Sequence, residues 1–346
     1  MLVMNFDPRN ILVIDFGQLG DVVLSLPALC AIRARFPQAR ITVLVAKSGA
    51  PVVDLSGYSD ATIVVDRTAL RDGWKMLSIF RIGKLVKQVR RERFDFVIDL
   101  HSSLETNLLG FLSRAPRRLY ARRPGRSLDL LANFHPKPPV EDSRPTRHAI
   151  DRYLDVLIPL GIKNTPRVPR LKTRAEDDAA VEQMLKKERA AAGAPLVGLF
   201  PGADHPGKGW PLARFGELAE HLMRNDGVRV VVFAGPKERE MVKEMRATFP
   251  RSTIILDRLT IPQLAAALAR LSVFVSDHAG PMHIAAAVQT SVVALLDGPT
   301  PNSFTPIEER YRVIHNRRIS EMTTAEVYEA TRELLVAGRT ATLFAS

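Results

Sequence analysis

Short runs of apolar residues recur along the chain, and each is bounded by glycine, proline or polar residues. Such runs are typical of strands that lie buried in a parallel sheet. The pattern predicts strands at 11–14, 41–45, 61–65, 94–100, 196–200, 228–234, 253–256, 273–276 and 292–296. Segments with helical spacing alternate with them, at 22–36, 76–93, 148–160, 211–224, 236–248, 261–271, 282–288 and 323–337. This alternation predicts an α/β protein with doubly wound parallel sheets.

The length of 346 residues predicts two domains, because it exceeds what one hydrophobic core usually organises. The stretch 163–172 contains two prolines and no periodic pattern, which is typical of a linker. We therefore place one domain at 1–165, a second at 166–322 and a terminal helical segment at 323–346. Two Rossmann-like domains would form a cleft at the carboxyl ends of their strands, where open α/β sheets bind ligands.

Composition and charge narrow the function classes. A content of 46% hydrophobic and 25% charged residues excludes a disordered chain. The single cysteine, Cys30, excludes an internal disulfide and an all-cysteine zinc site. We find neither a secretory signal nor an apolar run long enough to span a membrane, so we predict a cytoplasmic protein. The net charge of +12 favours an anionic partner: a nucleotide, a phosphorylated glycolipid, a membrane surface or a nucleic acid.

The first candidate site follows the first predicted strand, in the loop Gly17–Asp21. Gly20 allows close approach of the backbone to a ligand, although the segment lacks the third glycine of a dinucleotide fingerprint. Asp21 falls in the first turn of the next predicted helix. Its carboxylate can either cap that helix and complement its dipole, or act as a general base beside the cleft. Spacing alone leaves both roles open.

A second candidate is the segment 201–211, where a predicted strand ends in a loop rich in glycine and proline. We expect Lys208 to project from this loop, where its compact ammonium group suits a diphosphate. Trp210 and Pro211 then begin a helix. The alternative for Lys208 is an ordinary solvated loop lysine.

The third candidate is the segment 276–287, in which a strand ends and a helix begins after Gly280. A helix N-terminus favours an anion, because its first N–H groups are unpaired. Asp277, His278 and His283 surround this position, although a lone histidine is more often structural. A zinc site is disfavoured, because the two histidines are five residues apart and no thiolate accompanies them.

A cluster of arginines borders the stretch 124–147, which we expect to be an exposed loop. The cluster can attract an anionic acceptor or a membrane surface, or it can simply be solvated. Nucleic-acid binding is disfavoured, because no aromatic platform or recognition module accompanies the charge. The arginines are Arg114, Arg117, Arg118, Arg122, Arg123 and Arg126.

A family resemblance rests on four segments: GQLGDVVLSLPAL, PG…KGWP, SDHAGPMHIAAA and VVALLDGPT. In this order they resemble glycosyltransferase family 9, the heptosyltransferases of lipopolysaccharide core assembly. The resemblance implies a GT-B fold, with an acceptor-side domain, a nucleotide-sugar domain facing it across a cleft, and 323–346 returning to the first domain. It also implies an inverting, metal-independent transfer from a nucleotide sugar, commonly ADP-heptose, without a further cofactor. The expected partners are that donor, an anionic glycolipid acceptor and, peripherally, the cytoplasmic face of the inner membrane, but no nucleic acid.

Carried over residue by residue, the resemblance assigns roles to positions of this chain. It makes Asp21 the expected base. Our own candidates for the acceptor side are Gly20, Glu105, Arg122 and Arg123. Lys208 and the helix that begins at Gly280 would offset the charge of the leaving diphosphate, so that no metal is needed. The expected donor site comprises Gly202, Lys208, Glu238, Leu259, Asp277, His278, Ala279, Gly280 and His283.

Some positions depart from the family pattern. His278 stands where the family has an aspartate, with Asp277 one position earlier, and Ala279 replaces a hydroxyl residue. Asp15 and Glu105 stand where basic residues are usual. These departures keep three alternatives open: a transferase that uses another nucleotide sugar, a nucleotide-sugar epimerase or hydrolase, and a degenerate protein that only binds a nucleotide sugar.

Overall fold

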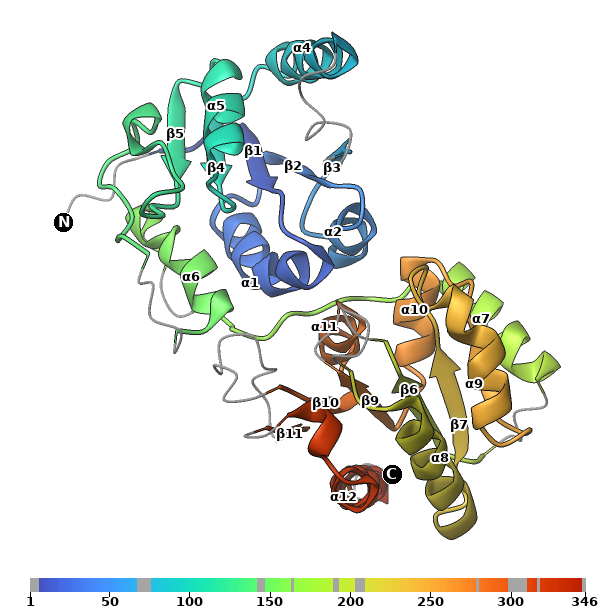
Figure 1. Cartoon of the computed structure of the whole chain (residues 1–346). Coiled ribbons are helices and arrows are strands. Elements are labelled where there is room, and N and C mark those ends of the chain that lie inside the picture. The colour runs from blue at the N-terminus through green and yellow to red at the C-terminus, as the bar shows by residue number, and fades with distance from the viewer. Residues whose placement is uncertain are drawn as a thin grey trace. The chain divides into compact units, whose positions relative to one another are not determined.

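The chain divides into two compact units in the computed structural model, Met1–Pro169 and Arg170–Ser346. The division falls inside the predicted linker 163–172, after residue 169 rather than residue 165 (Figure 1). The structure describes residues 6–66, 76–141, 147–162, 165–188, 193–202, 209–277, 280–297, 310–315 and 318–343.

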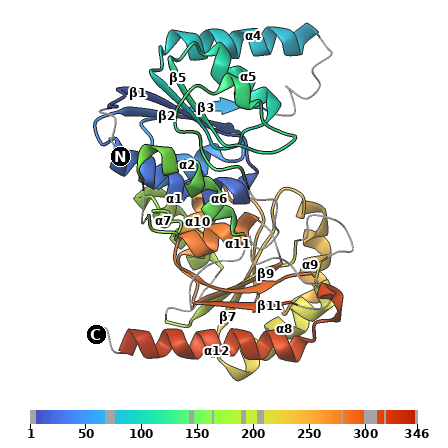
Figure 2. The ribbon, with the colours of Figure 1, turned by 90° about the vertical axis from the view of Figure 1, so that its left-hand side faces the viewer.

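The first unit is built on a five-stranded parallel sheet with the order β3-β2-β1-β4-β5. Its strands are β1 (Asn10–Asp15), β2 (Arg40–Ala46), β3 (Ala61–Val65), β4 (Phe96–Asp99) and β5 (Arg117–Tyr120). One face is covered by α1 (Leu19–Arg35), α2 (Ala50–Ser56) and α6 (Ala149–Asp155), and the other by α4 (Met76–Arg91) and α5 (Leu104–Leu112) (Figures 1 and 2). Short 3-10 helices lie at Asp129–Leu131 and Ile158–Leu160.

The second unit has a six-stranded parallel sheet with the order β11-β10-β9-β6-β7-β8. Its strands are β6 (Leu196–Phe200), β7 (Arg229–Phe233), β8 (Ile254–Leu256), β9 (Val273–Asp277), β10 (Ser291–Leu295) and β11 (Tyr311–Ile314). The helices α8 (Leu212–Asn225), α9 (Val242–Thr248) and α12 (Thr324–Leu343) share one core cluster with the sheet. The other helices are α7 (Ala175–Lys187), α10 (Ile261–Leu268) and α11 (Gly280–Ala287), with 3-10 helices at Arg239–Met241 and Ile319–Glu321.

The predicted α/β class is confirmed, and its physical basis is visible in the central strands. Residues 11–14 of β1 are fully buried, because the strand pairs with β2 and β4 and has helices on both faces. A strand buried in this way reads as a continuous apolar run, which is why sequence pattern finds it. In each unit the parallel strands bring their carboxyl ends to one edge of the sheet.

The structure also differs from the prediction. It adds β5, β11, α2, α5 and α7, and it breaks the predicted helix 148–160 into α6 and a separate 3-10 turn. The stretch 124–147 is not simply an exposed loop, because Phe134 is 6% exposed and its ring packs against that of Phe96 at 5.3 Å. An isolated bridge also pairs Arg122 with Val140.

The helix α12 contacts α8 and the strands β9, β10 and β11 (Figure 2). The expected return of 323–346 to the first domain stays a prediction. Among the described residues, no helix combines the length and the apolar character needed to cross a membrane.

Candidate active site

Two buried carboxyl groups end neighbouring strands of the first sheet. Asp15 is the last residue of β1 and Asp99 the last of β4, and the two strands pair directly. Asp15 is 1% exposed, and its Oδ1 accepts the backbone N–H of Gly17 at 2.9 Å. Burial of a carboxyl group without such donors is costly, so these contacts are part of how the edge is built. The carboxyl edge of this sheet, where open α/β sheets bind ligands, therefore carries polar chemistry.

Asp21 lies beside this edge, in the first turn of α1. Its Oδ2 accepts the backbone N–H of Gln18 at 3.0 Å, the contact that a capping-box carboxylate makes. The helix-capping role is thus confirmed, and the role as a base stays a prediction. A Cβ on Gly17 would lie 2.5 Å from the Cβ of Asp21, so the turn can close only with glycine there. The sequence does not indicate this internal contact at Gly17, and the expected approach of a ligand to Gly20 stays a prediction.

Tyr153 of α6 is a residue that sequence reasoning missed. It is 6% exposed, and burial raises the pKa of its phenol well above the usual range. The negative charges of Asp15 and Asp21 raise this pKa further, whereas Arg123 and Arg152 lower it. The hydroxyl is therefore neutral, and the four charged side chains that act on it come from β1, α1, the segment after β5 and α6 itself. The only signal in the sequence was an aromatic residue in a predicted helix, with nothing to show which way it faced.

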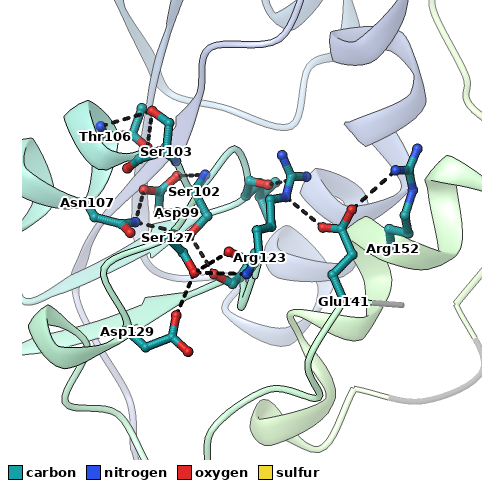
Figure 3. Close-up of polar contacts among 12 residues, drawn as sticks. Asp99, Ser102, Ser103, Thr106, Asn107, Arg123, Ser127, Asp129, Glu141 and Arg152 are labelled. Atoms are coloured by element: carbon teal, nitrogen blue, oxygen red, sulfur yellow. Dashed lines mark hydrogen bonds and ion pairs between the residues drawn. The ribbon is translucent and has the colours of Figure 1, made fainter. Parts of the chain in front are cut away.

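Asp99 is the centre of a buried network in the first unit (Figure 3). Its Oδ1 accepts the N–H of Ser102 at 2.7 Å, and its Oδ2 accepts Nδ2 of Asn107 at 2.7 Å. Asn107 Oδ1 accepts the N–H of Leu128 at 2.7 Å, which ties the segment after β5 to the start of α5. Burial raises the pKa of Asp99 to about 6, although these donors and the charge of Arg123 lower it.

Replacing Asn107 with alanine is expected to lower the free energy of unfolding by about 3 kcal/mol, because it removes the Nδ2 donor from two buried groups, the Asp99 carboxylate and the Ser102 hydroxyl. Asn133→Ala is the matched control: Asn133 is half-buried, and its Oδ1 accepts the N–H of Arg118 at 2.8 Å. We expect that control to cost about 1 kcal/mol. Urea unfolding followed by circular dichroism measures the free energy of unfolding of both variants. An equal decrease in the two would contradict a stabilising role of the Asp99 network.

Three of the six arginines of the cluster are engaged in contacts within the first unit. Arg122 Nε donates to Asp129 Oδ2 at 3.0 Å. Arg123 Nε pairs with Glu141 Oε2 at 2.6 Å, as Figure 3 shows. Arg118 donates to two backbone carbonyl oxygens. The interpretation as a merely solvated loop is therefore wrong for these three arginines. Their hydrogen bonds and ion pairs stabilise the segment that follows β5.

Two other predicted acceptor-side residues lie at helix starts. Gly20 is the second residue of α1 and is half-buried. Glu105 is exposed in the first turn of α5, where its Oε2 accepts the hydroxyl of Ser103 at 2.7 Å. A carboxylate in this place complements the helix dipole. Its expected part in acceptor binding stays a prediction.

In the second unit, Asp277 ends β9 and is 4% exposed. Its Oδ2 accepts the backbone N–H of Trp210 at 3.2 Å, so the strand end is tied to the start of α8. Among the described residues, its Oδ1 has no hydrogen-bond partner. Burial raises the pKa of Asp277 to about 7, and the Trp210 N–H lowers it only in part. The sequence placed this residue at the donor site but could not show its burial.

Glu238 and Gly202, two predicted donor-site residues, lie together at the ends of β7 and β6. Glu238 is 7% exposed, and its Oε2 accepts the N–H of Gly235 at 2.9 Å. A Cβ on Gly202 would lie 2.9 Å from the Cδ of Glu238 and 2.5 Å from a ring carbon of Phe200. The absence of a side chain at Gly202 therefore makes room for the glutamate.

The remaining predicted donor residues are placed only in part. Gly280 begins α11, and His283 in its first turn is 6% exposed. Leu259 is half-buried and directly precedes Thr260, the N-cap of α10. Lys208, His278 and Ala279 lie outside the described residues. Within the ranges that the structure describes, no cluster of His, Cys, Asp and Glu side chains could hold a metal ion.

Comparison with known proteins gives one consistent family. The model of glycosyltransferase family 9 (heptosyltransferase) matches residues 82–333. Lipopolysaccharide heptosyltransferase 2 of Escherichia coli (strain K12) is 27% identical over 320 residues, which cover 88% of this chain and 87% of that protein. Lipooligosaccharide heptosyltransferase 2 of Haemophilus influenzae is 25% identical over 307 residues, covering 86% and 85%. A solved glycosyl transferase family 9 protein from Veillonella parvula has a TM-score of 0.86 at 25% identity, over 96% of this chain and 99% of that one.

Proposed function

Because the chain belongs to glycosyltransferase family 9, we propose that it transfers heptose from ADP-heptose to a lipopolysaccharide core acceptor. The chain is a glycosyltransferase with the GT-B fold, and the single observation that carries the finer proposal is the family match across both units. The names of its relatives, lipopolysaccharide and lipooligosaccharide heptosyltransferases, support the choice of sugar and acceptor.

In the proposed mechanism, Asp21 removes the proton of the acceptor hydroxyl as this oxygen attacks the anomeric carbon of the donor. The bond from that carbon to the diphosphate breaks, and the configuration inverts. Asp21 Oδ2 is occupied by the Gln18 N–H, but its Oδ1 accepts no hydrogen bond from the described residues. One carboxylate can therefore cap α1 with one oxygen and take a proton with the other. The negative charge of this carboxylate also raises the pKa of the buried Tyr153 phenol, which therefore stays neutral.

On the donor side, we assign the leaving diphosphate to Lys208 and the first N–H groups of α11, and the nucleoside to Glu238 and Leu259. A lysine together with a helix N-terminus can offset the charge that develops on a leaving diphosphate. The proposal therefore requires neither a metal ion nor a further cofactor. The cytoplasmic location also remains a prediction from the sequence.

A transferase with a different nucleotide sugar is the second candidate, and the substitution pattern favours it. His278 and Ala279 replace the aspartate and hydroxyl residue that the family motif places beside the sugar. A site that loses such groups changes which sugar hydroxyls it can hydrogen-bond. Family membership argues against the epimerase and hydrolase alternatives.

A panel of nucleotide sugars, followed by product analysis, tests the proposed function. We expect ADP-heptose to raise the melting temperature most, because a ligand that binds only the folded state stabilises it by mass action. Transfer to a lipopolysaccharide core acceptor should continue in excess EDTA. Loss of transfer in EDTA would contradict the metal-free mechanism. Rapid donor hydrolysis or epimerisation without an acceptor, or donor binding with no turnover, would overturn the proposed function.

A further inference from the structure

The helix α4 covers the first sheet with only one side. Val89 is fully buried in the core cluster that β1 and β4 share, and Leu85 and Val86 pack against the same cluster. These positions recur at helical spacing and define the side of α4 that faces the sheet. The opposite side of the helix is therefore turned to solvent.

That outer side combines a bulky aromatic residue with positive charge. Phe80, Lys84, Lys87 and Arg91 follow one another at intervals of four, three and four residues, which places them on one side of a helix. All four are exposed, and Phe80 is 74% exposed. In the described part of the chain, none of the three cations has a carboxylate partner, whereas Glu92 at the end of the helix pairs with Arg40 at 3.7 Å.

The neighbouring helix α5 exposes an apolar stripe. Leu104, Leu108 and Phe111 are 55%, 45% and 45% exposed, and they share one side of the helix. Leu109, on the other side of α5, packs into the same core cluster as Val89 of α4. The two helices thus cover the same sheet face, side by side, with their outer sides turned away from it (Figures 1 and 2).

A backbone contact fixes α4 to the end of α5. Arg90 Nε donates to the carbonyl oxygen of Leu112 at 2.8 Å. The cations of α4 and the apolar stripe of α5 are therefore carried by one connected layer. We call this the α4–α5 surface, made of Phe80, Lys84, Lys87, Arg91, Leu104, Leu108 and Phe111.

We propose that the α4–α5 surface docks on a membrane of anionic phospholipids. Exposed aromatic and aliphatic side chains enter the boundary between headgroups and acyl chains, while Lys and Arg beside them bind the phosphates. A nucleic acid would use the cations but would leave the aliphatic stripe of α5 without a partner. Contiguous exposed apolar groups mark an interaction site rather than an ordinary solvated face. The inference deepens the proposed function. It rests on that function in one respect: the lipid anchor of the proposed acceptor would lie in the membrane on which the α4–α5 surface docks.

The test uses the variant Lys84→Gln/Lys87→Gln/Arg91→Gln and flotation with vesicles, in the absence of donor and acceptor. Wild type should bind vesicles that contain phosphatidylglycerol and bind pure phosphatidylcholine weakly. Each Lys or Arg near an anionic surface raises the affinity for the membrane severalfold. The partition coefficient of the variant onto these vesicles should therefore be on the order of 100-fold lower than that of wild type. The matched control is Lys186→Gln/Lys187→Gln/Lys243→Gln, which removes three exposed cations of the second unit. The proposal is overturned if the α4 variant binds like wild type, or if the control loses as much.

A second variant pair tests the apolar part. Phe80→Ala/Leu108→Ala should lower partition by about ten-fold, since both side chains would leave water on docking. Val336→Ala, at an exposed apolar position of α12, should leave it unchanged. Unchanged binding of the double variant would overturn the proposed insertion. A loss of DNA binding in the α4 variant, with vesicle binding intact, would assign the surface to nucleic acid instead.

Transfer to a water-soluble core oligosaccharide separates this inference from the proposed function. The α4 variant should keep wild-type turnover with that acceptor while it loses vesicle binding. Vesicle binding by a protein without transferase activity would refute the function and keep the docking surface. Transferase activity, together with equal vesicle binding by wild type and the α4 variant, would support the proposed function and refute the docking surface.

Discussion

Asp21→Asn is expected to lower kcat by about a thousand-fold while the affinity for ADP stays near that of wild type. A positioned general base contributes about 10²–10⁴ to the rate of a proton transfer. The amide cannot take the acceptor proton, yet its oxygen can still accept the Gln18 N–H that Asp21 Oδ2 accepts at 3.0 Å. The variant thus removes the proposed chemistry and retains the cap of α1. Steady-state transfer rates and calorimetry with ADP measure the two expectations.

The control for this variant is a second carboxylate with the same capping contact. Glu326 Oε2 accepts the backbone N–H of Thr323 at 2.9 Å, at the start of α12. Glu326→Gln should leave kcat within about two-fold of wild type, because a cap of this kind affects helix stability alone. A kcat near wild type in Asp21→Asn would remove Asp21 from the role of base. An equal loss in the two variants would attribute the effect to capping.

The sequence predicts the central strands well because they are buried on both faces. It misses β5, whose sequence Arg-Arg-Leu-Tyr is half polar, since a strand at the edge of the sheet needs fewer apolar residues. It also misses β11, at the edge of the second sheet. The pattern of apolar residues reflects the burial of a strand and not its hydrogen bonding. An edge strand with exposed positions is therefore hard to recognise from the sequence.

For the candidate site, the sequence identifies groups that lie next to a glycine turn or a helix start, such as Asp21 and Gly280. It does not show groups that meet only in three dimensions. The hydrogen bond between Asn107 and Asp99 joins two elements, and Tyr153, on a helix far along the chain, is coupled electrostatically to Asp15 and Asp21. Charge is the clearest case of this limit. The arginines at 114–126 stood out by number, yet three of them are engaged within the unit, whereas the cations of α4 have no carboxylate partner among the described residues.

The stability of the second unit should depend on pH through Asp277. The pKa of this carboxyl is about 7 in the folded protein, against an ordinary value of 3.8. The folded state therefore holds the proton more tightly than the unfolded chain does. The protonated Asp277 therefore contributes its full stabilisation of the folded state below about pH 4, and this contribution is lost as the pH rises through about 7. Above that range, the wild type carries a buried charge whose Oδ1 has no partner among the described residues.

Asp277→Asn removes this titration and keeps an oxygen that can accept the Trp210 N–H. The variant should match wild type near pH 4 and exceed it at pH 8 by a few kcal/mol, on the order of what a shift of this size is worth. Trp210 is 3% exposed, so its fluorescence reports urea unfolding of the second unit once Trp74→Phe has removed the other tryptophan. Glu240→Gln, at an exposed carboxylate of the same unit, is the control and should show no such change between pH 4 and pH 8. A difference between Asp277→Asn and wild type that stays constant over this range would mean that Asp277 remains ionised when buried, held by donors beyond the Trp210 N–H.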